Sequence, residues 1–244
     1  MPHPVAIEGF SADPARYESG RPGYPDEAIA AILEFAGDVD LIVDLGAGTG
    51  KLTRRLIGAD PTVIAVDPVI AMTRLIPQSA PRAHVVTGVA EALPFADAGV
   101  DCVTVAQAVH WFDADRAWPE IGRVIRPGGT LAILANVRLR EVAWVDALWS
   151  LMDEAERDAP WRQPGRMPMA LPHGFAPPLA AQFRHRVPMT ADSVIARLSS
   201  VSHIAMLDDA TRAGFERRAR EILRSVSGPL EIEYRTDLSL FRRS

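Results

Sequence analysis

The 244-residue sequence is poor in the residues that hold disulfide-rich and metal-binding proteins together. Its single cysteine, Cys102, excludes an intrachain disulfide framework and is typical of proteins from a reducing compartment. We expect Cys102 to be a core residue, because it lies within an apolar run. The six histidines are scattered without the spacing of metal ligands, so no metal site is predicted.

Long apolar runs and basic charge are also scarce. No stretch approaches the roughly 18 uncharged apolar residues of a membrane span, and Met1–Phe10 lacks the pattern of a signal peptide. The formal net charge of -5 argues against a nucleic-acid partner, since such proteins normally carry a basic excess. Nearly all the positive charge is arginine, because Lys51 is the only lysine. These features predict a soluble, cytoplasmic protein without a membrane partner, either a monomer or a homodimer.

The stretch Leu41–Gly50 carries the strongest structural signal. An apolar run containing one acid ends in three glycines at alternate positions, Gly46, Gly48 and Gly50, and leucines at helical spacing follow. This order predicts a buried parallel strand, a tight turn and a helix. Glycine suits such a turn because a Cβ would keep a ligand away from the backbone.

Two known phosphate-binding loops can be compared with this turn. Leu45 and Leu52 stand where a Walker A loop needs glycine and a hydroxyl residue, so a phosphate cradle is disfavoured. The dinucleotide pattern G-x-G-x-x-G differs only in the position of its last glycine. Asp67 ends the next apolar run, Val63–Val66, where an acid suits the two hydroxyls of a ribose. The residues therefore favour an adenosyl ligand and leave open what is attached to it.

The rest of the chain predicts further alternation of helices and strands. Expected helices span 26–35, with Asp26 as N-cap, 69–76, 115–125 and 141–158, and expected strands span 83–87, 100–106 and 130–135. The end of the helix at 115–125 and a turn are expected at 126–129. Strands near 181–187 and 230–241 would pair antiparallel. Residues 160–178 are expected to form a loop, and helices within 190–226 a lid over the site.

Four junctions that follow strands carry unusual residues. They are Gly46–Gly50, Asp67, Ala90–Glu91 and Gln107–Trp111. Ligands of open α/β sheets bind at the carboxyl ends of the strands, so these junctions should lie along one rim. The segment Tyr17–Pro25 is too rich in proline and glycine to predict a regular element. That arm either packs inertly over the domain or closes a pocket.

The motifs together resemble those of class I S-adenosylmethionine-dependent methyltransferases. Val43–Gly50 is similar to their first motif, Asp67 to their ribose-binding acid, Ala90–Phe95 to their adenine-flanking segment, and Arg126–Gly129 to the turn before their fifth strand. The arm and the run Gln107–Trp111 resemble the type 11 branch that includes trans-aconitate methyltransferase-like enzymes. The resemblance covers roughly residues 10–135 and does not identify the acceptor.

The resemblance implies a Rossmann-like α/β fold: a seven-stranded, mostly parallel sheet with helices on both faces, an antiparallel last strand and a helical lid. One domain would fill residues 1–244, with an arm and helix at 1–36, a cofactor-binding core at 37–140 and a C-terminal half at 141–244. The cofactor would be S-adenosylmethionine and the partner a small-molecule acceptor. The residues implied to bind the cofactor are Arg21, Asp44, Gly46, Ala47, Gly48, Gly50, Asp67, Pro68, Met72, Val89, Ala90, Glu91 and Gln107.

Several of these roles are specific. Asp44 would support the loop and the methionine amino group, while Pro68 and Met72 would pack against the adenine. Many family members have Asp where Val89 stands, so Glu91, a backbone carbonyl or water would meet the adenine amino group. Arg21 would bind a carboxylate of cofactor or substrate, or dock the arm through a salt bridge.

Acceptor binding is expected at Tyr17, Tyr24 and Trp111. His110 is the candidate catalytic residue, which would orient the acceptor or remove its proton, and the alternative is a pocket wall. Two other functions remain open for the same fold class. One is a non-catalytic S-adenosylmethionine-binding protein, and the other is a nicotinamide-dependent oxidoreductase.

Overall fold

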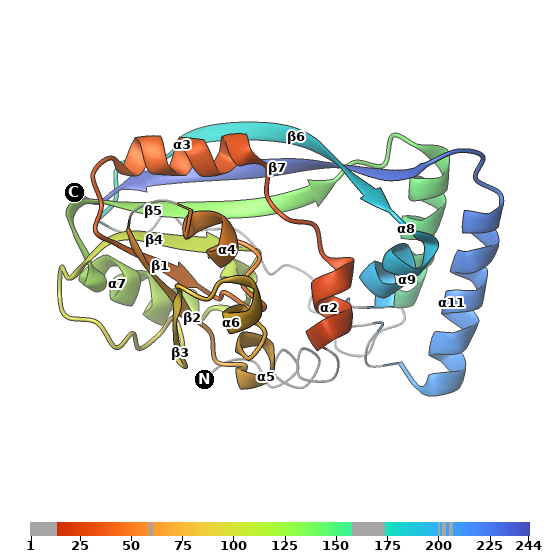
Figure 1. Ribbon diagram of the computed structural model, residues 1–244, viewed down its shortest axis with the longest axis horizontal. Helices are drawn as coiled ribbons and strands as arrows, with labels where there is room; N and C mark the ends of the chain where they lie inside the picture. The colour runs from red at the N-terminus through yellow and green to blue at the C-terminus, as the bar shows by residue number, and fades with distance from the viewer. Residues whose placement is uncertain (1–13, 59–60, 158–173, 200, 202–203, 205–206) are drawn as a thin grey trace.

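The computed structural model describes residues 14–58, 61–157, 174–199, 201, 204 and 207–244, which form one seven-stranded sheet flanked by helices (Figure 1). The strands are β1 (Leu41–Leu45), β2 (Thr62–Val66), β3 (His84–Val86), β4 (Val100–Ala106), β5 (Ile125–Arg138), β6 (Leu179–Met189) and β7 (Leu230–Arg242). The helices are α2 (Pro14–Gly20), α3 (Asp26–Ala36), α4 (Thr53–Leu56), α5 (Ile70–Thr73), α6 (Ile76–Ser79), the 3₁₀ turn η1 (Val109–Trp111), α7 (Ala114–Val124), α8 (Ala143–Arg157), α9 (Ala191–Ser199) and α11 (Asp209–Arg224).

The seven strands have the order β3-β2-β1-β4-β5-β7-β6, and the predicted Rossmann-like, mostly parallel sheet is confirmed. Strands β1 to β5 pair in parallel, whereas β7 pairs antiparallel with both β5 and β6. The direction in which successive strands are added to the sheet reverses at β1. The next strands in the chain, β2 and β3, lie on one side of β1, whereas β4 and β5 lie on the other. Ligands of open α/β sheets bind at such a switch point, outside the carboxyl ends of the strands. The glycine loop after β1 and Gln107 after β4 both lie there.

Both faces of the sheet are covered, which explains why the parallel strands are nearly continuous apolar runs. On one face, Ile32 of α3 and Leu56 of α4 pack with Ile42 and Cys102. On the other, Ile121 of α7 packs with Val43. The predicted core position of Cys102 is confirmed, since its side chain is fully buried and burial raises its pKa to about 12.

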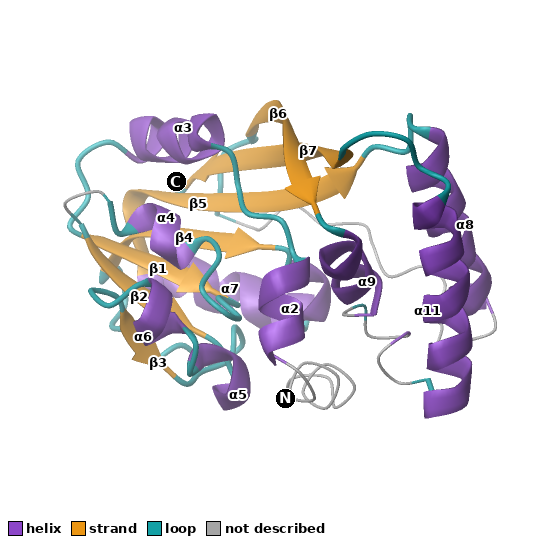
Figure 2. Cartoon of the chain, turned by 45° about the vertical axis from the view of Figure 1, so that its right-hand side comes forward, coloured by secondary structure: helices purple, strands orange, loops and turns teal. Residues whose placement is uncertain are grey.

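The last two strands extend beyond the parallel part of the sheet and carry a separate apolar cluster. Trp149 of α8, Leu198 of α9 and Phe215 of α11 pack there with Tyr234 of β7. Figure 1 shows these three helices gathered at the far end of β6 and β7, away from α3 and α7. Figure 2 shows α2 lying between this helical group and the parallel strands.

Three local predictions are wrong. The arm is not irregular throughout, because Pro14–Gly20 forms helix α2, with proline at its first position and glycine at its last. Asp26 is the first residue of α3 and not its N-cap; Pro25 occupies the cap position, and the Asp26 carboxylate pairs with Arg55. The helix expected over 69–76 is divided into α5 and α6, and Pro77 lies in the first turn of α6, where proline is tolerated.

The segment 126–129 also differs from the expected separate turn. Helix α7 ends at Val124, close to the predicted end, but the four residues lie within the bounds of β5. Between the pairs Val100–Ile125 and Cys102–Thr130 the register shifts, so this tract is an irregularity inside the strand. Gly128 there has a φ of 74°, which favours glycine.

Most of the loop expected at 160–178 lies outside the described residues. Within the described part of the chain, no helix is both long and apolar enough to cross a membrane.

Candidate active site

The glycine loop after β1 is held in a conformation that only glycine tolerates well. Gly46, Gly48 and Gly50 have φ values of 73°, 56° and 85°, in the left-handed region. A Cβ on Gly46 would lie 2.4 Å from the Cβ of Ala108, which leads out of β4. The backbone N–H groups of Gly46 and Ala47 donate to the Val66 carbonyl oxygen, at 2.8 and 3.2 Å. The loop therefore has no side chain at three of its five positions, and its backbone is tied to β2.

Asp67 lies across this loop at the end of β2. Its Oδ2 accepts a hydrogen bond from the Gly48 N–H at 2.9 Å, and its Oδ1 accepts one from the Val69 N–H at 2.8 Å. The side chain is buried, and burial raises the pKa of its carboxyl group. Each carboxylate oxygen has more than one lone pair, so both can accept a further hydrogen bond from a ligand hydroxyl.

Asp44 lies under the loop, inside β1. Its Oδ2 accepts from the Thr53 hydroxyl at 2.6 Å and its Oδ1 from the Thr104 hydroxyl at 3.3 Å. The residue is 1% exposed, and burial raises the pKa of its carboxyl group to about 6, although both hydroxyls oppose that shift. Near neutral pH it is therefore a buried carboxylate that a ligand cation would stabilise.

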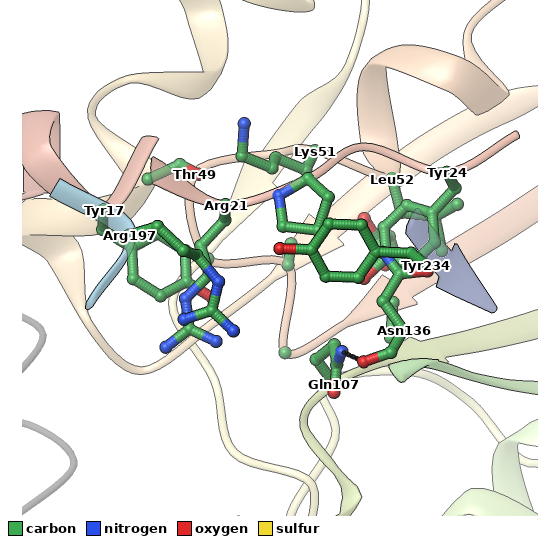
Figure 3. A pocket seen from close by; sticks show the side chains of 16 residues that line it. Tyr17, Arg21, Tyr24, Thr49, Lys51, Leu52, Gln107, Asn136, Arg197 and Tyr234 are labelled. Atoms are coloured by element: carbon green, nitrogen blue, oxygen red, sulfur yellow. Dashed lines mark hydrogen bonds between the residues drawn. The ribbon is translucent and has the colours of Figure 1, made fainter. Parts of the chain in front are cut away.

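A cavity opens beside the loop, with about 550 Å³ of empty space that includes open solvent. Figure 3 shows Tyr17, Arg21 and Arg197 at one end, with Gln107 and Asn136 apart from them. The described residues that line it are Tyr17, Arg21, Pro22, Tyr24, Asp44, Gly46, Ala47, Gly48, Thr49, Lys51, Leu52, Ala106, Gln107, Asn136, Arg197 and Tyr234.

The arm closes one side of this cavity. Helix α2 packs so tightly on α9 that a Cβ on Gly20 would lie 2.6 Å from the Arg197 backbone nitrogen. Toward the glycine loop, the Glu18 carboxylate of α2 pairs with Lys51 at 3.1 Å and with Arg54 at 2.8 Å. The arm therefore joins the glycine-loop region to α9 and is part of the cavity wall.

The comparisons with known proteins agree on one family. A family model described as a methyltransferase domain matches residues 43–133, which run from β1 into β5. An uncharacterised methyltransferase of Mycobacterium tuberculosis is 37% identical over 214 residues, covering 88% of this chain and 85% of that protein. The chain belongs to the class I S-adenosylmethionine-dependent methyltransferases.

Two further relatives extend the likeness beyond the matched domain. An uncharacterised methyltransferase-like protein of Schizosaccharomyces pombe is 30% identical, covering 93% of this methyltransferase and 90% of the relative. The solved structure of a candidate type II methyltransferase from Anaeromyxobacter dehalogenans is 28% identical, with a TM-score of 0.71 over 91% of this chain and 97% of that chain. Use of S-adenosylmethionine is general to the family.

The methyltransferase brings many of the predicted site residues to the cavity wall. Among the residues assigned to the cofactor, the lining includes Arg21, Asp44, Gly46, Ala47, Gly48 and Gln107, and among those assigned to the acceptor it includes Tyr17 and Tyr24. Gln107 has a φ of 58°, an unusual value for a residue other than glycine, and its side-chain amide donates to the Asn136 carbonyl oxygen at 2.9 Å.

The other predicted residues lie beside the cavity rather than in its lining. Gly50 ends the loop, and Asp67, Pro68 and Met72 follow β2 beside it; the Met72 methyl would be 3.6 Å from a Cβ on Gly48. Val89 and Ala92 form an isolated bridge around Ala90.

Glu91 and η1 extend the rim on the side of α7. The Glu91 Oε1 accepts from the Asp113 N–H at 2.8 Å, at the start of α7. His110 is exposed in η1, with its ring 4.9 Å from that of Trp111. Neither ring belongs to the cavity lining.

Sequence reasoning missed Asn136, Arg197 and Tyr234 in this methyltransferase. Asn136 and Tyr234 come from β5 and β7, which pair with each other although they are far apart in sequence, so no local pattern brings the two residues together. Arg197 had a readable signal, because it falls three residues after Val194 on the apolar face of α9, where a charged residue is unusual. Among the described residues, no three His, Cys, Asp or Glu side chains gather as metal ligands would.

Proposed function

We propose that this methyltransferase transfers a methyl group from S-adenosylmethionine to a small-molecule acceptor that binds in the cavity beside the glycine loop. The observation that supports this most is the cavity itself: one wall is the glycine loop and the other is the arm with Arg197. A ligand held on the loop would therefore face a partly polar space between the loop and the arm.

The residues present fit the cofactor. The backbone of Gly46, Ala47 and Gly48 would line its methionine portion, and Asp67 would bind the ribose hydroxyls through its remaining lone pairs. Asp44 and Arg21 line the same cavity with opposite charges, which suits an α-ammonium and an α-carboxylate.

Pro68, Met72 and Ala90 would pack around the adenine. The Glu91 carboxylate is bonded to the start of α7, so its second oxygen is the group left for the adenine amino group.

When bound, S-adenosylmethionine supplies a methyl group on a sulfonium sulfur, which an acceptor lone pair can take without a protein nucleophile. The chain's own residues need only hold the acceptor in line and exclude water. Tyr17, Tyr24 and the buried Leu52 provide aromatic and apolar wall around the acceptor space. This explains why no nucleophile–base pair is needed.

His110 is the candidate proton acceptor, but its exposed ring lies outside the cavity lining. We therefore expect His110→Ala to lower kcat less than tenfold. Steady-state kinetics with the identified acceptor test this. A loss in kcat of about 100-fold or more, the range of general-base catalysis, would make His110 the base.

Cofactor affinity should depend on pH through Asp44. Burial raises the pKa of this acid to about 6, so the carboxylate is ionised at pH 7.5 and gains a proton as the pH falls through 6. A bound ammonium favours the ionised form, so affinity should be constant above pH 7 and fall by up to about tenfold per unit below 6. Calorimetric titration of S-adenosylhomocysteine at pH 5 and 7.5 measures this, and Asp44→Asn should remove most of the dependence.

Two binding experiments and one assay test the function. Titration should show saturable binding of S-adenosylhomocysteine and none of NADH; the reverse result would favour an oxidoreductase. A screen of metabolite pools with isotopically labelled S-adenosylmethionine, read by mass, should then reveal a labelled acceptor. Tight cofactor binding without any labelled product from broad pools would favour the non-catalytic binding protein.

A further inference from the structure

Residues 88–95, which we call the rim segment, join β3 to β4 at the cofactor side of the sheet. Apart from one isolated bridge, the segment has no regular secondary structure. It begins beside the proposed ribose-binding acid, because the Gly88 N–H donates to the Asp67 carbonyl oxygen at 3.4 Å. A Cβ on Gly88 would lie 3.0 Å from a side-chain methyl of Val66. The rim segment is therefore packed closely on the end of β2.

Two side chains of α7 supply hydrogen-bond partners to the main chain of the rim segment. Peptide groups outside helices and strands need such partners when water does not reach them. The Glu120 Oε1 accepts from the Leu93 N–H at 2.7 Å. The Arg123 guanidinium donates to the Leu93 carbonyl oxygen at 3.1 Å and to that of Phe95 at 2.9 Å. Leu93 is thus held through both of its main-chain polar groups by a helix that lies beyond β4 in the chain.

Glu120 and Arg123 also bind each other. The Arg123 Nε donates to Glu120 Oε2 and its Nη2 donates to Glu120 Oε1, each at 2.8 Å. The guanidinium of Arg123 holds the pKa of the Glu120 carboxyl group below its usual range, so the acid is ionised at neutral pH. Two parallel hydrogen bonds fix the planes of both groups relative to each other. Neither side chain can therefore turn away from the rim segment without breaking this pair.

The start of α7 holds the same segment. The Asp113 N–H donates to Glu91 Oε1 at 2.8 Å. Ala90 and Leu93, on either side of Glu91, are buried in the core cluster to which α7 also contributes. The rim segment is therefore attached to one helix at Glu91, Leu93 and Phe95. The places of Ala90 and Glu91 at the cofactor rim depend on that helix.

We propose that Glu120 and Arg123 are positioning residues for the purine of the cofactor, because they hold the rim segment where Glu91 meets the amino group of adenine. This inference rests on the proposed function, which places the cofactor on the glycine loop and its ribose at Asp67. A carboxylate accepts a hydrogen bond from the adenine amino group, but in hypoxanthine it would face a carbonyl oxygen that cannot donate. The pair on α7 therefore sets the preference for adenine without touching it.

Calorimetric titration of the full chain with S-adenosylhomocysteine and S-inosylhomocysteine tests this role. The two ligands differ only in the purine, where a carbonyl oxygen replaces the amino group. The wild type should prefer S-adenosylhomocysteine by about tenfold or more. Glu120→Ala and Arg123→Gln should each weaken its binding about tenfold and that of S-inosylhomocysteine less than about threefold, so the preference falls. A residue that only supports the fold would lower Tm and leave this preference unchanged.

Three further variants make the result specific. Glu120→Gln keeps an oxygen that accepts from the Leu93 N–H and should lose less affinity than the alanine variant; it also keeps the test valid if Glu120→Ala does not fold. Asp97→Ala removes an ion pair of Arg123 whose acidic side chain is 81% exposed, and it should change affinity less than about twofold. Arg116→Gln, at an exposed position of the same helix, is the matched control and should bind both ligands as the wild type does.

Three results would overturn the positioning role while the proposed function stands. They are a wild-type preference in both Glu120→Ala and Arg123→Gln, the absence of any preference in the wild type, and equal losses of affinity in Asp97→Ala and Arg123→Gln. The last result would assign the effect to the exposed ion pair instead of the main-chain bonds. A wild-type protein that binds neither ligand would overturn the proposed function, and this inference with it.

Discussion

Asp67→Ala is expected to weaken S-adenosylhomocysteine binding by at least about 100-fold. A carboxylate that accepts two ribose hydroxyls contributes two hydrogen bonds to a charged group, each of about 1.5–3 kcal/mol. The substitution also leaves the Gly48 and Val69 N–H groups without the acceptor that they share. Both effects act on the loop that the cofactor would contact. Calorimetric titration measures the affinity, and thermal melting shows whether the variant folds.

Two variants make this result specific. Asp67→Asn keeps one side-chain oxygen as an acceptor and should lose less affinity than the alanine variant. Asp38→Ala removes an exposed aspartate that precedes β1 and should leave binding unchanged. Wild-type affinity in Asp67→Ala would mean that no ligand hydroxyl meets this acid, and the adenosyl assignment would be lost.

Gly46→Ala is expected to remove cofactor binding and to destabilise the fold. The added Cβ would lie 2.4 Å from that of Ala108, and neither group has a rotamer by which it could move away. A φ of 73° costs a residue other than glycine a further 1–2 kcal/mol or so. The loop must therefore shift out of place. We expect a loss of at least about 2 kcal/mol in the free energy of unfolding, or roughly 4–8 °C in Tm.

Gly23→Ala is the matched control for this change. Gly23 belongs to the arm, has no other atom within 4 Å of an added Cβ and does not have a positive φ. It should melt and bind as the wild type does. Equal behaviour of the two variants would show that the glycine loop tolerates side chains and has no close ligand.

Local patterns in the sequence were sufficient for the parallel part of the sheet. The prediction of a strand at Val100–Ala106 has both ends correct. A mainly apolar run between turn residues is typical of a strand that is buried on both faces of its sheet. The glycine loop, Asp67 and Gln107 could be placed at one rim for the same reason, since parallel strands end together. These features depend only on residues that are close in the chain.

The remaining features depend on contacts that no local pattern encodes. Helix α2 is a seven-residue segment that begins with proline and ends with glycine, and it lies against α9, far away in sequence. The proximity of Arg138 to Tyr234 follows from strand register between β5 and β7. Arg197 reaches the cavity only because α9 packs beneath the arm. The end of the cavity at Arg197, where we propose that the acceptor binds, is therefore assembled by tertiary structure, and the end at the glycine loop is encoded by sequence motifs.

The sole lysine gives this protein a chemical handle. Lys51 lies in the cavity wall next to the glycine loop, with its side chain 14% exposed. Burial lowers the pKa of its amine, although the charge of Glu18 opposes that shift. An acylating reagent therefore meets only one lysine, and it is located at the site of interest. Modification there would attach a reporter group to a single lysine side chain, and its rate would register whether the space beside Lys51 is filled.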